Sequence, residues 1–225
     1  GEGKLYEVDM RLRPAGEAGP IASAFEAFIK YQQTDAWTWE RQALTRARVI
    51  CAGGDLGARF DKVMRDVLTT PRDPEKLASE VAEMRGRLHK EHGTDDVWSV
   101  KHLRGGLVDI EFIAQYLQLR YGAEVPEILA RDTASVLKAS GEHGLIEKDV
   151  ASDLMSATIL WRNLQGILRL TVEGRFDPAS AAPALKSAIV RACGAVDFDA
   201  LTQTMQQSAA QTIGHYDAIF RSPDS

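Results

Sequence analysis

Charged and apolar side chains alternate in residues 5–14, LYEVDMRLRP, which form the first stretch that could do chemistry. The apolar residues favour an extended backbone that ends at Pro14. On a strand, alternate side chains share a face, and here one face would carry Glu7, Asp9, Arg11 and Arg13. A carboxylate beside two guanidinium groups suits metal and phosphate binding. The solvated face of an amphipathic strand shows the same alternation, so spacing alone leaves both interpretations open.

Three blocks of sequence together resemble glutamine synthetase adenylyltransferase, a two-headed enzyme family that adds AMP to a tyrosine of glutamine synthetase and removes it. The blocks are residues 6–20, which include YEVDMRLRP, residues 36–49, AWTWERQALTRARV, and residues 101–120, which include GGLVDIEF. The resemblance covers Leu5 to Gly122, and AWTWE looks like the C-terminal, adenylylating half of the family. From there to Ser225 the sequence reads as generic helical protein.

The resemblance implies a reaction in which ATP and a protein tyrosine give AMP-tyrosine and pyrophosphate, with three aspartates holding two Mg²⁺ ions. It implies that Asp9 is the third of these carboxylates, as catalytic residue and metal ligand, and it makes Arg11 and Arg13 candidate phosphate contacts. Members of this superfamily carry the other two aspartates upstream, after a Gly-Ser turn, and this sequence shows no such element. The closest segment, GGDLG at 53–57, lacks the serine and the second aspartate, and it reads as a helix stop with Asp55 as the next N-cap. We therefore expect the chain to be part of a longer enzyme and to be inactive alone.

A cluster of arginines and tryptophans follows in the second block. Asp35 could cap a helix running to about Ile50, which would carry Trp37, Trp39, Glu40, Arg41, Arg46 and Arg48. Guanidinium groups suit phosphate oxygens, so Arg46 and Arg48 are candidate contacts of the triphosphate, and Glu40 could orient an arginine. Two tryptophans this close are also typical of a helix–helix contact. The sequence does not decide which arginine would meet the nucleotide.

The third block offers weaker candidates. Arg104-Gly105-Gly106 precedes a helix whose free amides could bind an anion, although a plain loop accounts for the same residues. Asp109 and Glu111 are two positions apart and do not face each other on a helix, which argues against a paired acid–base role. Both suit the first turn of a helix, and the resemblance hints that one of them supports an arginine. His89, His92 and His102 are close in sequence but lack a cysteine partner, and cations near a helix end account for them.

Composition favours a helical protein. The 225 residues are 44% hydrophobic but only 7% aromatic, and alanine and leucine dominate. A net charge of -5 argues against nucleic acid as a main partner, and no apolar run is long enough for a membrane span. Cys51 and Cys193 lack metal-ligand spacing and are expected to be reduced, buried thiols of a cytoplasmic protein.

Helix signals continue from Ser23 to the end of the chain. Ser23 to Glu26 has the pattern of a capping box, and Asp73-Pro74 that of a helix start. Apolar periodicity predicts helices near residues 56–68, 74–88, 107–121, 133–139, 148–171, 183–193 and 199–220. The predicted fold is mainly α: a helical bundle at 23–225 follows residues 1–22, a short β remnant at the edge of a nucleotidyltransferase sheet. The bundle could divide into two lobes near 122–126 or 174–183.

Two functions fit these observations. In the first, the chain completes the adenylylating half of an enzyme that uses ATP and Mg²⁺, with glutamine synthetase, the PII signalling protein and other domains of the same enzyme as partners. In the second, the helices from Ser23 onward form a non-catalytic interaction module that contacts glutamine synthetase or PII.

Overall fold

The computed structural model describes residues 19–220, so the predicted strand at residues 5–12 lies outside the described part of the chain. Residues 19–220 form helices and no β-strand, which confirms the mainly α class. In chain order the helices are α1 (Phe25–Thr34), α2 (Thr38–Leu44), α3 (Leu56–Leu68), α4 (Pro74–His92), α5 (Leu107–Tyr121), the 3₁₀ helix η2 (Pro126–Ile128), α6 (Thr133–Glu142), α7 (Lys148–Thr171), α8 (Pro183–Cys193) and α9 (Phe198–Phe220).

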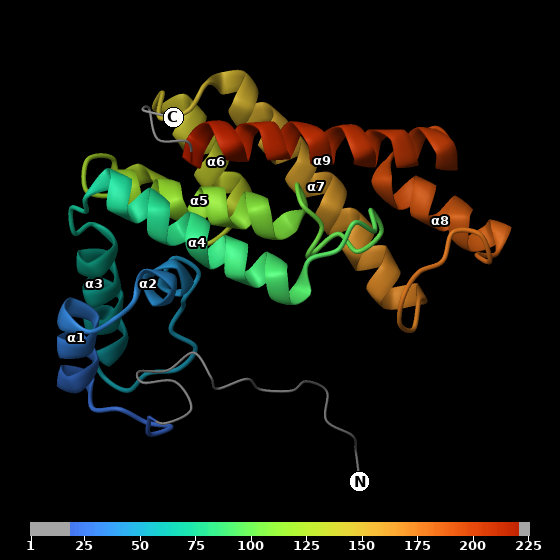
Figure 1. Ribbon diagram of the computed structural model, residues 1–225. Helices are drawn as coiled ribbons and strands as arrows, with labels where there is room; N and C mark the ends of the chain where they lie inside the picture. The colour runs from blue at the N-terminus through green and yellow to red at the C-terminus, as the bar shows by residue number, and fades with distance from the viewer. Residues whose placement is uncertain (1–18, 221–225) are drawn as a thin grey trace, which may run out of the picture.

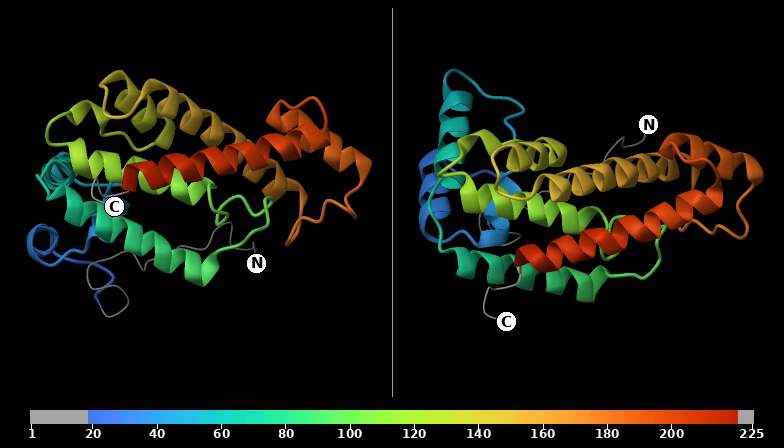
Figure 2. Two further views of the ribbon diagram at one scale, coloured as in Figure 1. Left: turned by 45° about the horizontal axis from the view of Figure 1, so that its top comes forward. Right: turned by 90° about the horizontal axis from the view of Figure 1, so that it is seen from above.

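The bundle is elongated, with the shorter helices at its two ends. In Figure 1 the helices α1, α2 and α3 gather at one end, and α8 forms the other. The long helices α4, α5, α7 and α9 fill the middle, and the two turned views in Figure 2 show α9 running alongside α5. This middle layer holds the residues that the site is built from.

Helix α5 is the centre of the core, because it is buried on nearly every side. Ile110, Ile113 and Leu117 are at most 1% exposed, and even the polar Asp109 and Gln118 on this helix are buried. Trp161 and Leu164 of α7 and Met205 of α9 are completely buried and belong to the same cluster. A helix that is covered all round fixes the positions of its polar side chains more firmly than a surface helix does.

Several boundaries agree with the sequence prediction because local signals decide them. The Asp73 carboxylate accepts a hydrogen bond from the amide of Lys76 at 2.7 Å, and Pro74 is the first residue of α4. Helix α7 spans Lys148–Thr171 and α8 spans Pro183–Cys193, as the periodicity and the proline indicate. Leu77 and Val81 of α4 and Leu154, Trp161 and Leu164 of α7 are buried, whereas Met84, Leu88 and Leu168 of the same stripes are half-buried.

The predicted starts of the first two helices are wrong. Helix α1 begins at Phe25 with Ala24 at its N-cap and no side-chain cap, so the Ser23 to Glu26 capping box does not form. Asp35 ends α1 instead of starting α2. The N-cap of α2 is Trp37, whose amide donates to the Glu40 carboxylate at 2.8 Å. Glu40 thus provides an acceptor for the Trp37 amide, which has no partner within the helix.

Helix α2 also ends earlier than predicted, at Leu44 instead of near Ile50. The amides of Thr45, Arg46 and Ala47 each bond to a carbonyl three residues back, which is the tighter 3₁₀ pattern. The Thr45 hydroxyl donates to the Gln42 carbonyl at 2.7 Å, a local bond of the kind that competes with helix continuation. Arg46 and Arg48 therefore lie beyond the helix on which the sequence placed them.

The apolar stripe of α3 is only partly buried. Met64, Val67 and Leu68 belong to the core, whereas Leu56 is 40% exposed and Phe60 and Val63 are half-buried. The Phe60 ring stacks on Phe28 of α1, with ring centroids 4.8 Å apart. The expected full burial of this stripe therefore holds for its C-terminal half alone. Helix α1 covers the other half only partly, through contacts of Phe25 and Phe28 with the Phe60 ring.

Arg72 joins the end of α3 to the core helix. Its guanidinium donates to the carbonyls of Val67, Leu68 and Thr70 and to that of Leu119 on α5, at 2.6 to 3.3 Å. Burial, and then the neighbouring Arg41, lowers the pKa of Arg72 to about 10. The last carbonyls of a helix have no partner within it, so one side chain here satisfies several of them.

Two further expectations can be compared with the described residues. Cys51 is exposed, contrary to the prediction of a buried thiol, because the loop after α2 lies at the surface; Cys193 is half-buried. None of the helices within residues 19–220 is long and apolar enough to cross a membrane.

Candidate functional site

A buried carboxylate lies at the first turn of α5. Asp109 is completely buried, and one of its oxygens accepts hydrogen bonds from Arg85 Nε of α4 and from Arg104 Nη1, the latter at 2.8 Å. Its other oxygen accepts the amide of Gly105 at 2.5 Å. Three donors, two of them cationic, surround a single carboxylate, which is what allows a charge to remain buried.

Arg104 extends this cluster to helix α9. Its guanidinium lies over the Tyr216 ring, 4.8 Å from the centroid, and 3.6 Å from Asp217. Burial, followed by the nearby Asp109, raises the pKa of Tyr216 to about 12. The Tyr216 hydroxyl and Arg85 Nη2 have no hydrogen-bond partner among the described residues. We call these five side chains the Asp109 cluster: Arg85, Arg104, Asp109, Tyr216 and Asp217.

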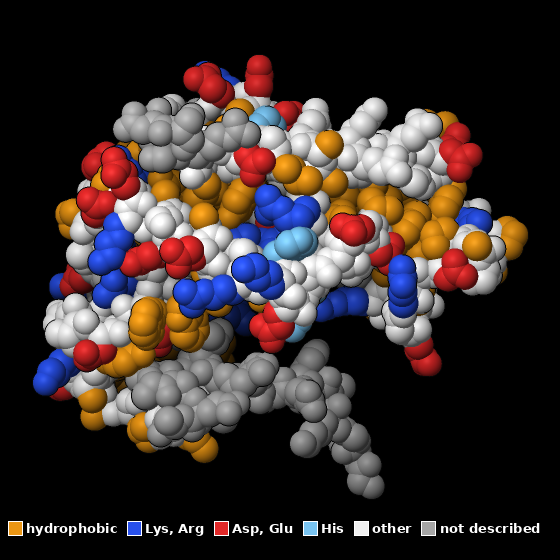
Figure 3. Space-filling model, in the orientation of Figure 1, with side chains coloured by type: hydrophobic (Ala, Val, Ile, Leu, Met, Phe, Trp, Pro, Cys, Tyr) orange, Lys and Arg blue, Asp and Glu red, His pale blue; other side chains and the backbone are white. Residues whose placement is uncertain are grey.

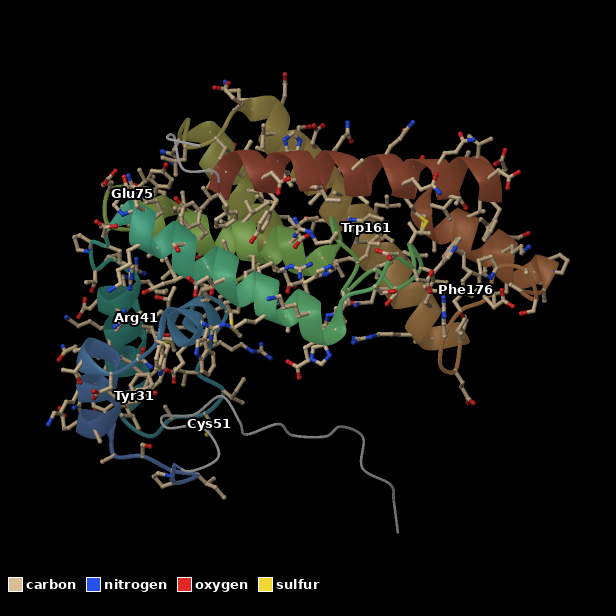
Figure 4. The ribbon with its side chains drawn as sticks, viewed as in Figure 1. Tyr31, Arg41, Cys51, Glu75, Trp161 and Phe176 are labelled. Atoms are coloured by element: carbon tan, nitrogen blue, oxygen red, sulfur yellow. The ribbon has the colours of Figure 1, made fainter. Side chains whose placement is uncertain are left out.

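Gly105 allows the loop before α5 to approach α9 closely. Its φ is +76°, and a Cβ at this position would overlap the backbone of Ala209 on α9. Its carbonyl accepts a hydrogen bond from the indole of Trp161 on α7 at 3.2 Å. Figure 4 shows Trp161 on α7 near the point where α5 and α9 come together. The glycine is needed here for both its backbone conformation and its lack of a side chain.

The predicted anion site at Arg104-Gly105-Gly106 is closed by the protein itself. The Gly105 amide binds Asp109, and the amides of Gly106, Leu107 and Val108 bond to the carbonyls of Leu103, Val100 and Lys101. The start of this helix does hold an anion, but the anion is the side chain of Asp109.

Arg46 is held on the surface by α5. Its Nη1 lies 2.7 Å from Glu111 Oε1, with the Arg46 side chain 47% exposed and the Glu111 side chain 25% exposed. One helical turn away, the Gln42 side-chain amide donates to Gln115 at 3.1 Å, which fixes α2 against α5. Arg48 is exposed in the loop that follows. The structure therefore places one guanidinium in a defined orientation and leaves the other in solvent.

Among the described residues, Glu40 pairs with a tyrosine and a backbone amide and with no arginine. Its two oxygens accept the Tyr31 hydroxyl at 2.8 and 2.9 Å, and one also accepts the Trp37 amide. Arg41 donates instead to the Gln32 carbonyl on α1 at 3.2 Å. Figure 4 shows Tyr31 and Arg41 together at the α1–α3 end of the molecule. These residues join α1 to α2, so the described contacts of Glu40 are structural.

The remaining predicted site residues are those of the amino-terminal stretch and the three histidines considered as metal ligands. Asp9, Arg11 and Arg13 lie outside the described residues. Within residues 19–220, no group of three or more His, Cys, Asp or Glu side chains is close enough to hold a metal ion. His92 and His102 do lie near each other, with ring centroids 5.3 Å apart. The described carboxylates therefore do not form a Mg²⁺ site by themselves.

Sequence reasoning missed Arg85, the main partner of Asp109. A signal was present, because Arg85 follows Leu77 by eight residues and Val81 by four and so shares their buried face of α4. Arginine is almost never fully buried without a partner, so a cation on an apolar stripe predicts a buried carboxylate. The resemblance indicated that Asp109 or Glu111 supports an arginine, but it did not indicate that this arginine would be Arg85.

Two family models match the chain. The model described as Glutamate-ammonia ligase adenylyltransferase matches residues 1–63, and the model described as GlnD PII-uridylyltransferase matches residues 75–220. The bifunctional glutamine synthetase adenylyltransferase/adenylyl-removing enzyme of Rhodopseudomonas palustris (strain TIE-1) is 45% identical over 223 residues, 99% of this chain. The chain belongs to the glutamine synthetase adenylyltransferase family.

Other members of the family show nearly the same identity over a slightly shorter stretch. The enzymes with the same name from Bradyrhizobium diazoefficiens and Xanthobacter autotrophicus are each 44% identical over 209 residues, 93% of this chain. The chain spans about a fifth of these adenylyltransferases, 22% of the Rhodopseudomonas enzyme and 21% of the other two. The similarity continues well past Gly122, where the sequence alone suggested only generic helical protein. The helices up to α9 are thus part of what relates this chain to the adenylyltransferase family.

Proposed function

We propose that this chain is part of an enzyme that transfers AMP from ATP to a tyrosine of glutamine synthetase and so regulates nitrogen assimilation. The observation that carries the proposal is the 45% identity to a glutamine synthetase adenylyltransferase over 99% of the chain. In the proposed reaction the phenol oxygen bonds to the α-phosphorus of ATP, the bond to the bridging oxygen breaks, and pyrophosphate leaves. The phenol proton passes to solvent. The enzyme would act in the cytoplasm.

The proposed division of labour follows the resemblance. Residues 1–22 would be the edge of a nucleotidyltransferase domain, and Asp9 would bind Mg²⁺ with carboxylates from outside this sequence. Arg11 and Arg13 would contact the nucleotide phosphates. The helical bundle at 23–225 would support that domain, and Arg48 would be a second, more mobile phosphate contact beside Arg46.

Arg46 is the described residue best suited to a phosphate. Glu111 fixes one edge of its guanidinium, while 47% of the side chain remains exposed. An arginine oriented beforehand loses less conformational entropy when it binds an oxyanion. We propose that Arg46 contacts the triphosphate and that Glu111 is a positioning residue.

Replacement of Arg46 by glutamine in the full-length enzyme should raise the KM for ATP about tenfold or more. A hydrogen bond to a charged group contributes about 1.5–3 kcal/mol, which corresponds to such a change. Glu111→Gln should raise the same KM by a smaller factor and leave kcat nearly unchanged. The matched control is Arg59→Gln. It removes an exposed arginine of α3 that forms an ion pair with Glu26 of α1. An Arg46→Gln enzyme with the KM of the control would rule out the phosphate contact.

A second candidate function is an interaction module that contacts glutamine synthetase or PII. Trp37 is 70% exposed at the edge of a hollow of about 750 Å³ between α2 and α4. Acidic and basic side chains line this hollow together, among them Glu80, Glu83 and Arg87. Exposed tryptophans are enriched among the residues that dominate protein–protein binding.

Trp37→Ala should weaken binding of the chain to whichever of the two proteins it contacts by at least about thirtyfold, the effect of losing about 2 kcal/mol at a dominant interface residue. Surface plasmon resonance with immobilised glutamine synthetase, and separately with PII, measures this. Ile159→Ala is the control, because Ile159 is 56% exposed on α7, away from the hollow. Equal affinities of the two variants, or no binding to either protein, would exclude this role for Trp37.

A further inference from the structure

A separate hollow lies on the other side of the molecule from α1–α3. It has a volume of about 520 Å³ and is formed by residues 94–101, by the C-terminal end of α7 and by residues 174–176. Small-molecule sites typically measure about 300–1,000 Å³ and have mostly apolar walls with a few polar groups that converge on the ligand. The volume of this hollow falls in that range, and its lining combines five apolar side chains with polar and charged ones.

The base of the hollow is apolar and rigid. Trp98, Val100 and Phe176 line it and are each at most 8% exposed. The Trp98 ring contacts Phe176, with centroids 4.7 Å apart, and stacks on Phe198 of α9 at 5.0 Å. Leu168 of α7 and Val172, the C-cap residue of that helix, add half-buried apolar surface to the wall. Figure 4 shows Phe176 beside the end of α7.

The rim of the hollow is cationic. Lys101, Arg169 and Arg175 line it from three different segments, and Asp96 is its single lining carboxylate. Asp96 is already engaged, because its oxygens accept Arg175 Nε at 3.0 Å and the Trp98 amide at 3.1 Å. Within residues 19–220, the side chains of Lys101 and Arg169 make no ion pair or hydrogen bond that would neutralise them. Two cations at this rim are therefore uncompensated.

The segments around the hollow carry both signs of charge, because Glu91, Asp95 and Glu173 are exposed there as well as the cations. Burial, followed by the nearby Lys101, His92 and Arg85, lowers the pKa of His102, which is next to Lys101 in the loop. In Figure 3, blue Lys and Arg side chains and pale-blue His side chains lie across the middle of the face, where α4 ends in Figure 1, with red Asp and Glu side chains among them. Arg169 also lies in the last turn of α7, where a cation is favourable. The dipole of α7 does not explain the position of Lys101, because Lys101 belongs to the loop of residues 94–101.

We propose that this hollow binds a small organic anion, with Lys101 and Arg169 at its oxyanion group and the apolar wall at its carbon body. The oxyanion is a phosphate or a carboxylate, since guanidinium and ammonium groups bind both. The Gln165 side chain, half-buried in the same wall, can donate and accept hydrogen bonds with other polar groups of the ligand. This site does not depend on the proposed AMP transfer.

Phenyl phosphate is a suitable probe, because it combines the oxyanion with an apolar ring. Calorimetric titration of the chain should give a Kd of about 1 mM or tighter, which corresponds to about −4 kcal/mol. Amide chemical shifts should change within residues 94–101 and 168–176. Benzoate in a parallel titration distinguishes a carboxylate site from a phosphate site, according to which probe binds more tightly. Inorganic phosphate and phenol should each bind at least about tenfold more weakly than the better probe, because each offers only half of the interaction.

The double variant Lys101→Gln, Arg169→Gln should lower the affinity for the better probe by at least about tenfold. The control Arg191→Gln removes an exposed arginine from α8, outside the hollow, and should leave the affinity unchanged. Three outcomes would overturn the proposal: no saturable binding of either probe, equal binding of inorganic phosphate, or equal affinity of the double variant and the control.

Discussion

Replacement of Asp109 by asparagine is expected to lower the free energy of unfolding by about 3–5 kcal/mol. The side chain is completely buried, and its charge balances Arg85, which is 2% exposed, and Arg104. Asparagine keeps the shape but is neutral, so Arg85 would remain as an uncompensated buried charge. The asparagine amide would also face N–H donors with its own N–H groups. A domain of this size is typically stable by only about 5–15 kcal/mol, so the variant should be close to unfolding.

Urea denaturation of the chain, followed by circular dichroism, measures this loss. The control is Glu111→Gln, two residues further along the same helix, where the ion pair with Arg46 is partly exposed. Exposed pairs contribute about 0–1 kcal/mol, so this variant should differ little from wild type. In the double variant Arg85→Met, Asp109→Asn, the removal of the buried cation should recover part of the loss. An Asp109→Asn protein as stable as Glu111→Gln would show that the cluster does not hold the bundle together.

The long helices could be predicted from the sequence because their signals are local. The boundaries of α7 and α8 follow from apolar periodicity, the proline at the start of α8 and the stop after each helix. Asp73 and Pro74 likewise specify the start of α4, because the whole capping signal lies between Asp73 and Lys76. These signals need no knowledge of what packs against the helix.

The errors arise where contacts between distant residues decide the outcome. Ser23 has the right neighbours for a cap, but the Glu40 contacts with Tyr31 and Trp37 set how α1 and α2 meet. The early end of α2 is accompanied by a bond from Arg131 Nε to the Ala47 carbonyl, across 84 residues of sequence. No pattern near residue 47 could reveal that contact.

The candidate site shows the same limit. Asp109 lies in the first turn of α5 as predicted, whereas Glu111 is the fifth residue of the helix and lies beyond that turn. Their partners Arg85, Arg104 and Arg46 come from outside α5. Gly105 and Gly106 agree with the plain loop and not with the alternative anion site, because Asp109 and nearby carbonyls already bond to the amides. The roles proposed for Asp9 and Arg46 in the reaction remain predictions.

The most direct test of the proposed function is the Asp9→Asn substitution in the full-length enzyme. Asparagine is a poorer ligand for Mg²⁺ than aspartate, because this hard cation favours charged oxygen ligands. The rate of AMP transfer should fall by at least about a hundredfold, a loss of about 2.7 kcal/mol of transition-state stabilisation. Removal of AMP from glutamine synthetase, which the resemblance assigns to the other half of the enzyme, should continue at its normal rate and so control for folding.

The measurement is the incorporation of labelled AMP into glutamine synthetase with ATP and Mg²⁺, for the wild-type enzyme, the Asp9→Asn enzyme and the isolated 225-residue chain. The proposal predicts rapid incorporation by the wild type, a loss of at least about a hundredfold in the variant, and none above background with the isolated chain. Near-normal incorporation by the Asp9→Asn enzyme, or turnover by the isolated chain, would contradict it.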